Sequence, residues 1–173
     1  MKALPPSIAE RLSFQPHDFF TPEPLKNIDV FLLRMIIHDW PNAEAKQIIS
    51  NLVNSMKPGG RLIIMDTVLP QPGSVPVVTE AASRVRDLTM MQVHNSKERE
   101  LDEWIALLKG ADERLRLQNV VQPFGSLMSV LEVVRDDAVR TNGIAKGDAY
   151  GKLDGTVEGE VPPIAALPGA VAT

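Results

Sequence analysis

The residues best suited to chemistry are His38, Asp39 and Trp40, which directly follow an apolar run at residues 28–37. Val, Ile, Leu and Phe dominate this run, a composition typical of a strand buried on both faces of a parallel sheet. Because ligands bind beyond the carboxyl ends of the strands in open α/β sheets, His38 would lie where a catalytic side chain is presented. A structural alternative stays open, in which His38 is only a polar strand terminus and Asp39 or Trp40 caps the next helix.

A helix and a second strand are predicted directly after these residues. Six apolar residues have the spacing of a one-sided helix, and they are Ala45, Ile48, Ile49, Leu52, Val53 and Met56. The Lys-Pro-Gly-Gly sequence at residues 57–60 is expected to end the helix. Residues 62–65 form a second buried run, which ends at Asp66. Since a strand, a helix and a strand form a right-handed crossover, His38 and Asp66 should lie at the same edge of the sheet, within reach if the strands are neighbours.

Asp18 and Phe19 form a motif with two interpretations. They follow an expected short strand at residues 12–15. An acid beside an aromatic ring can hold a purine, because the carboxylate accepts a hydrogen bond from the exocyclic amine while the ring packs on the base. The alternative is a turn in which Asp18 bonds its own backbone.

A further helix is predicted over residues 81–92, beyond a proline-rich loop. It carries Met90 and Met91, which either pack in the core or line a ligand site, because methionine side chains adapt to both. Asn95 and Glu98 have the spacing of a capping box for the helix that follows. This spacing predicts a structural role for Glu98.

The ordered part of the chain is expected to end in an antiparallel hairpin. Two strand-like runs are joined by a short proline-glycine connection, and these runs are residues 115–121 and 127–134. Beyond them glycine, alanine and proline dominate and no apolar periodicity remains, so the segment cannot bury enough surface to offset its ordering entropy. We therefore expect one domain over residues 1–135 and a disordered tail over residues 136–173.

Length, charge and composition limit the class of protein. The chain of 173 residues suits one globular domain, and its net charge of −4 without a compensating basic cluster argues against a nucleic acid or an anionic membrane as partner. With no cysteine there is no disulfide or thiolate site, and the three histidines lack the close spacing of a metal site, so no metal is expected. No secretory signal or membrane span is recognisable, which favours a cytoplasmic location.

Three motifs follow one another in a specific order: Ile37-His38-Asp39-Trp40, the run from Lys57-Pro58-Gly59-Gly60 to Asp66, and Asn95-Ser96-Lys97-Glu98-Arg99. In this combination they resemble the C-terminal half of the catalytic domain of S-adenosylmethionine-dependent small-molecule O-methyltransferases, the type known from plant caffeate and flavonoid enzymes and from fungal secondary metabolism. The similarity extends from about residue 12 to residue 134. It implies an α/β fold with a partial Rossmann-like class I methyltransferase sheet, flanking helices and a C-terminal antiparallel hairpin.

The resemblance also implies a reaction and a set of site residues. The family transfers a methyl group from S-adenosyl-L-methionine to a hydroxyl of a small acceptor, and an imidazole, with a pKa of about 6.5, is suited to take the hydroxyl proton. Nine residues of this chain match functional positions: His38 as the general base, Asp66 and Glu98 beside it, Asp18, Phe19 and Arg34 near the cofactor, and Met90, Met91 and Asn95 near the substrate.

Part of the nucleotide-binding machinery of that family does not occur in this sequence. It lacks the glycine-rich turn after a first strand and the acid that binds the ribose, and the N-terminal dimerisation domain of the family is missing too. We therefore expect a truncated enzyme that does not turn over substrate alone and that self-associates or binds a partner chain along an exposed sheet edge. The alternative function is a non-catalytic remnant that acts as a protein-interaction module. Clustered groups with shifted pKa values would favour the enzyme, and scattered acids beside an apolar patch would favour the module.

Overall fold

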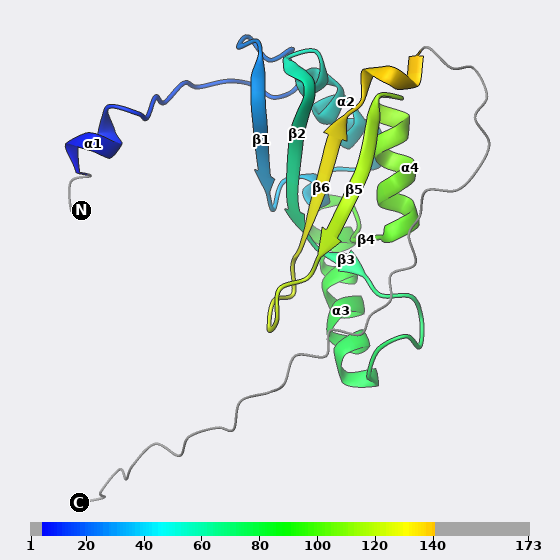
Figure 1. Cartoon of the computed structure of the whole chain (residues 1–173). Helices are drawn as coiled ribbons and strands as arrows, with labels where there is room; N and C mark the ends of the chain where they lie inside the picture. Colours follow the sequence, from blue (N-terminus) through cyan, green and yellow to red (C-terminus); the bar gives the residue numbers. More distant parts are fainter. Residues whose placement is uncertain (1–4, 141–173) are drawn as a thin grey trace, which may run out of the picture. The chain divides into compact units, whose positions relative to one another are not determined.

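The fold is built on a mixed four-stranded sheet (Figure 1). The structure is a computed structural model and describes residues 5–140. The spatial order is β1-β2-β6-β5, and the strands are β1 (Ile28–Arg34), β2 (Met56–Asp66), β5 (Leu115–Val121) and β6 (Ser129–Arg135). β1 and β2 run parallel, whereas β6 is antiparallel to both β2 and β5. The expected α/β class and the hairpin of β5 and β6 are therefore confirmed.

Helices complete the fold, and two of them build the core against the sheet. The helical segments within the described residues are α1 (Pro6–Ala9), η1 (Ile37–Asp39), α2 (Asn42–Val53), α3 (Val77–His94), α4 (Leu101–Ala111) and η2 (Asp137–Arg140). Two short strands, β3 (Val68–Leu69) and β4 (Arg99–Glu100), pair in parallel as a separate ribbon. In the core, buried side chains of α2 and α4 meet those of β2 and β6, among them Ile48, Leu62, Trp104 and Leu131.

The helix predicted after the first strand is confirmed as α2, but it ends at Val53 and not at the Lys-Pro-Gly-Gly sequence. Met56, expected on the inner face of this helix, is buried in β2. Gly59 has a φ of +73°, and a Cβ at Gly60 would lie 2.8 Å from the backbone oxygen of Lys57, so both positions require glycine. The register between β1 and β2 shifts here. The glycine pair therefore shapes an irregular strand instead of ending a helix.

β1 is shorter and more exposed than predicted. It stops at Arg34, and Met35, with a φ of +53°, redirects the chain towards η1. Val30 and Leu32 are 54% and 60% exposed, so the prediction of a strand buried on both faces is wrong. The physical reason is that the core covers only one face of β1, which is an edge strand of the sheet formed by residues 5–140.

The prediction of a strand at residues 12–15 is also wrong. This segment is irregular, and Phe14 is 89% exposed. A strand is stabilised by hydrogen bonds to a neighbouring strand, and no strand of the described part of the chain pairs with this segment. The local apolar pattern was therefore not sufficient to form a strand.

α3 confirms the helix predicted over residues 81–92 and extends it to 18 residues, none of which is buried.

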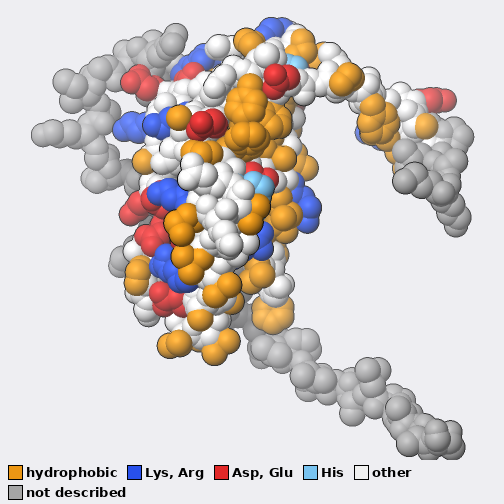
Figure 2. Space-filling view, turned by 180° about the vertical axis from the view of Figure 1, so that it is seen from behind, with side chains coloured by type: hydrophobic (Ala, Val, Ile, Leu, Met, Phe, Trp, Pro, Cys, Tyr) orange, Lys and Arg blue, Asp and Glu red, His pale blue; other side chains and the backbone are white. Residues whose placement is uncertain are grey.

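Seen from the side opposite to Figure 1, hydrophobic, acidic and basic side chains are interspersed over the surface (Figure 2). No helix of the described residues has the length and apolar character needed to cross a membrane. At the C-terminal end Asp136 pairs with Arg116 at 3.3 Å before η2, and the rest of the expected tail, residues 141–173, lies outside the described residues.

Candidate active site

His38 lies in η1, at the carboxyl end of β1 and beside the carboxyl end of β2. The two strands are parallel neighbours, so both ends meet at one edge of the sheet. The backbone N–H of His38 donates to Oδ2 of Asp66 at 3.4 Å. The prediction that His38 and Asp66 share this edge is confirmed, although a 3₁₀ turn and not the strand itself presents the imidazole.

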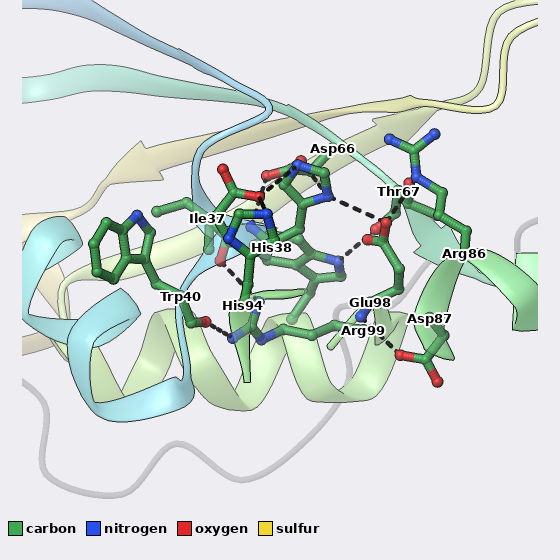
Figure 3. A network of polar contacts seen from close by, with 12 residues as sticks. Ile37, His38, Trp40, Asp66, Thr67, Arg86, Asp87, His94, Glu98 and Arg99 are labelled. Carbon is green, nitrogen blue, oxygen red and sulfur yellow. Dashed lines mark hydrogen bonds and ion pairs between the residues drawn. The ribbon is translucent and has the colours of Figure 1, made fainter. Parts of the chain in front are cut away.

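Two buried carboxylates face one nitrogen of the His38 ring (Figure 3). Nδ1 donates a hydrogen bond to Oε1 of Glu98 at 3.1 Å, and Oδ1 of Asp66 lies 3.7 Å from the same nitrogen. All three side chains are almost completely excluded from solvent. Since a carboxylate can only accept, the proton of a neutral imidazole is held on Nδ1, which leaves Nε2 with a free lone pair.

The capping-box prediction for Asn95 and Glu98 is wrong. Asn95 ends α3 in the left-handed conformation, with a φ of +53°, and the capping box of α4 is formed by Glu100 and Glu103. The helix begins later than the local pattern indicated, because β4 occupies the residues between. Glu98 is thereby free to point inwards and bond His38.

Two residues of α3, Arg86 and Asp87, fix Glu98 in place. Nε of Arg86 donates to Oε1 of Glu98 at 2.8 Å, and Oδ1 of Asp87 accepts the backbone N–H of Glu98 at 2.9 Å. Sequence reasoning missed both residues. The only available signal was their position on the helix that precedes Glu98, since the contact depends on how α3 crosses the end of the sheet.

Arg99 is a second residue that sequence reasoning did not assign, although it belongs to the motif around Glu98. It is fully buried, and Nη1 and Nη2 donate to the backbone oxygens of Ile37 at 3.1 Å and Trp40 at 2.8 Å. Its guanidinium lies 5.5 Å from the ring centre of Trp104, whose indole N–H donates to the oxygen of Thr67 at 3.2 Å. Arg99 therefore anchors the backbone of η1 on the core.

The charges in this cluster shift each other's pKa values. Burial alone would lower the pKa of His38, but the hydrogen bond to Glu98 and the charges of Asp66 and Glu98 outweigh it, so the pKa of His38 lies above 6.5. Burial raises the pKa of Asp66 to about 6, against the opposing effect of His38. Burial would raise the pKa of Glu98 too, but His38 and Arg86 outweigh it and lower this pKa. Glu98 is therefore the ionised partner of the imidazole.

The other ring nitrogen of His38 faces a more open region. Nε2 lies 3.4 Å from Oδ1 of Asp39, and the same oxygen lies 3.5 Å from Nε2 of His94. The side chains of Asp39 and His94 are 31% and 38% exposed. The nitrogen that can accept a proton thus faces side chains that are themselves partly exposed to solvent.

Of the residues assigned to the cofactor, Phe19 contacts Trp40 and α2, and Arg34 ends β1. Oδ1 of Asp18 accepts the N–H of Phe20 at 3.0 Å, which is the turn that the structural alternative predicted, while the carboxylate remains exposed. Phe19 packs edge-on against Trp40, with ring centres 5.9 Å apart. Arg34 is exposed at the last position of β1. The structure thus brings Phe19 beside the His-Asp-Trp turn, but it shows no contact of Asp18 or Arg34 with His38.

The residues assigned to the substrate lie at the C-terminal end of α3. A pocket of about 410 Å³ includes Met91 and Asn95, and its lining consists of Pro41, Asn42, Asp87, Leu88, Met91, Asn95, Ser96 and Lys97. Met90 is half-buried and does not line this pocket. Of the three assigned residues, two are therefore together, and the pocket borders the turn that follows His38.

The sheet topology and the cluster of His38, Asp66 and Glu98 together indicate a class of protein. A buried imidazole, held by carboxylates at the carboxyl edge of an α/β sheet, is an arrangement that can accept a proton from a bound ligand. In agreement, residues 1–112 match the O-methyltransferase domain family, and the chain belongs to this family.

Individual relatives agree with this assignment. O-methyltransferase VdtC of Byssochlamys spectabilis is 58% identical over 132 residues, which are 76% of this chain and 30% of VdtC. The structure of mitomycin 7-O-methyltransferase MmcR superposes with a TM-score of 0.64 at 26% identity, over 75% of this chain and 35% of MmcR. OxaC in complex with SAH and oxaline superposes with a TM-score of 0.62 at 27% identity, over 73% and 31% of the two chains. The chain thus spans about a third of the length of the relatives it matches.

Proposed function

We propose that this chain carries the catalytic base of an S-adenosylmethionine-dependent O-methyltransferase, which methylates a hydroxyl of a small aromatic or secondary-metabolite acceptor. The observation that carries the proposal is the geometry of His38. Its Nδ1 is bonded to Glu98 at 3.1 Å beside buried Asp66, and its Nε2 faces the partly exposed side chain of Asp39.

The reaction requires a base because a phenol, with a pKa of about 10, is mostly protonated at neutral pH. Nε2 of His38 accepts the hydroxyl proton while the oxygen forms its bond to the methyl carbon. S-adenosylmethionine, when bound, would supply that carbon from its sulfonium, and the electron pair of the sulfur–carbon bond would stay on sulfur. The imidazolium that results is stabilised by Glu98 and Asp66.

The residues near the proposed cofactor position fit an adenine ring. The carboxylate of Asp18 is exposed and has acceptor capacity beyond its bond to Phe20, so it can accept from an exocyclic amine. Phe19 offers a partly exposed ring, held because its backbone oxygen accepts from Asn51 at 3.0 Å. We assign Asp18 and Phe19 to the adenine and Arg34 to the neighbouring part of the cofactor. The SAH in the OxaC complex supports a cofactor of this type.

We assign Met90, Met91 and Asn95 to the acceptor. Met91 and Asn95 combine an adaptable apolar group with an amide in one pocket, a mixture suited to an aromatic ring with polar substituents. The oxaline bound to OxaC supports a small-molecule acceptor. We further propose that the protein acts in the cytoplasm without nucleic acid or membrane partners and that the exposed edge of β1 is its surface for self-association or a partner chain.

The alternative of an interaction module is less favoured by the site. Burying Asp66 and Glu98 beside an imidazole is costly, and replacing such groups by apolar residues is often neutral or stabilising. A fold that served only as a binding surface would have no need of this cluster. Groups with shifted pKa values that converge on one side chain are typical of catalytic sites.

The test is a chimera in which the matching 132 residues of VdtC are replaced by those of this chain, so that the site is assayed in a protein of full length. His38→Ala should lower methyl transfer roughly 100-fold or more with little change in cofactor affinity, because the base acts on the acceptor. His17→Ala is the control, since His17 lies outside the cluster and pairs with Glu23. Turnover of the His38 variant close to that of the control would disprove the proposal.

A further inference from the structure

Acidic groups outnumber cations around His38. Charged or titratable groups approach the imidazole from each element packed around it, and these are Asp39 on η1, Asp66 on β2, Arg86 and His94 on α3, Glu98 between α3 and β4, and Arg99 on β4. Three carboxylates around one imidazole stabilise the imidazolium. A base must be unprotonated to accept a proton, so an unopposed cluster would hold His38 in its inactive form.

Arg86 is the cation that acts most directly on this excess of negative charge. Its Nε donates at 2.8 Å to Oε1 of Glu98, the same oxygen that accepts the bond from Nδ1 of His38. Arg99 has a different role, because two of its nitrogens bond backbone oxygens of the η1 turn and Nε bonds the side chain of Asn42. Arg86 and His38 therefore share one carboxylate oxygen of Glu98 as hydrogen-bond acceptor. The positive charge of Arg86 opposes the negative charge of Glu98 at the imidazole.

We propose that Arg86 is a positioning residue that shares the Oε1 oxygen of Glu98 with His38 and offsets the charge of Glu98 at the imidazole, so that the imidazole remains available as a base. The inference rests on the proposed function for the role of His38 as the base. The contacts that carry it do not depend on which acceptor is bound. Arg86 acts through Glu98 and touches neither the cofactor nor the acceptor in this proposal.

The experiment is an NMR titration of the ring of His38 in the 173-residue chain. In Arg86→Gln and in Arg86→Met the pKa of His38 should rise by roughly 0.5 to 1, because Glu98 then acts on the imidazole alone. Arg86→Lys restores the charge and should return the pKa towards that of the parent. Arg84→Gln is the matched control, because Arg84 lies on the same helix and pairs with Glu100 at 3.3 Å, away from His38.

Two results would overturn the role of Arg86. One is a pKa of His38 that is the same in the Arg86 variants as in Arg84→Gln. The other is a lowered pKa, as expected for removal of Glu98, which would show that Arg86 only holds Glu98 in place. The titration needs neither cofactor nor acceptor, so its outcome is separate from that of the chimera. A raised pKa of His38 in the Arg86 variants, combined with an inactive chimera, would count against the proposed methyl transfer but not against the role of Arg86.

Discussion

Replacing Asp66 by asparagine should stabilise the folded chain at neutral pH while it weakens the base. Asp66 is fully buried, and its Oδ1 has no hydrogen-bond partner in the described structure. Burial raises its pKa from 3.8 to about 6, against the opposing charge of His38. The folded state therefore binds this proton more tightly than the unfolded state does.

The sign and size of the effect follow from that difference. The contribution of Asp66 to stability is fully present below pH 3.8 and is lost as the pH rises to about 6. Each pKa unit corresponds to about 1.4 kcal/mol, so ionised Asp66 lowers the free energy of unfolding by about 3 kcal/mol. Asparagine is uncharged, has the same shape and retains an oxygen that can accept the N–H of His38. We expect Asp66→Asn to gain up to about 3 kcal/mol at pH 7.5 and nothing below pH 4.

Urea unfolding followed by tryptophan fluorescence at several pH values between 4 and 7.5 measures this difference. The raised pKa of His38 affects stability above pH 6.5 and the lowered pKa of Glu98 affects it below pH 4.5, so the window between them reports mainly on Asp66. Asp29→Asn is the control, because Asp29 is an exposed acid. An Asp66 variant that is less stable than the parent at pH 6.5, or a difference that does not change with pH, would refute the reasoning.

Two further substitutions test other parts of the site. Glu98→Gln in the chimera should lower the pKa of His38, because Glu98 raises it. The acidic limb of the pH-rate profile should therefore move to lower pH, and the maximal rate should fall about tenfold or more. An acidic limb that does not move would contradict this prediction. Trp104→Ala should lower the free energy of unfolding by about 3 to 5 kcal/mol, because Trp104 is fully buried and its N–H bonds Thr67. Phe124→Ala, at an exposed position, should have almost no effect in the same denaturation assay, and equal losses in both variants would exclude a specific role for Trp104.

The elements that the sequence predicted best are those whose pattern and neighbours are close along the chain. The stripe from Ala45 to Val53 predicted α2, and the apolar run that ends at Asp66 predicted β2, because α2 connects two strands that pair with each other. The short strand expected near Phe14 failed for the opposite reason. No strand of residues 5–140 pairs with it, and a local pattern carries no information about whether a pairing partner exists.

The site was predictable only in part. His38 and Asp66 could be placed together from strand direction alone, because parallel strands end at one edge. Glu98 was assigned through family resemblance, whereas its local spacing indicated a helix cap. Arg86 was not predicted, since its contact with Glu98 depends on the path of α3 across the sheet end, and no periodicity in the sequence records that path.

The backbone contacts of Arg99 have a consequence for engineering. Arg99 holds the turn through the main-chain oxygens of Ile37 and Trp40, so these two hydrogen bonds do not involve the side chains at the two positions between them. Arg99 thus holds the turn through the turn's backbone, and Asp66 contacts both that backbone and the imidazole. Exchange of His38 or Asp39 would leave both of these anchoring hydrogen bonds of Arg99 in place. The residue that holds the turn, Arg99, therefore lies outside the segment that would be changed.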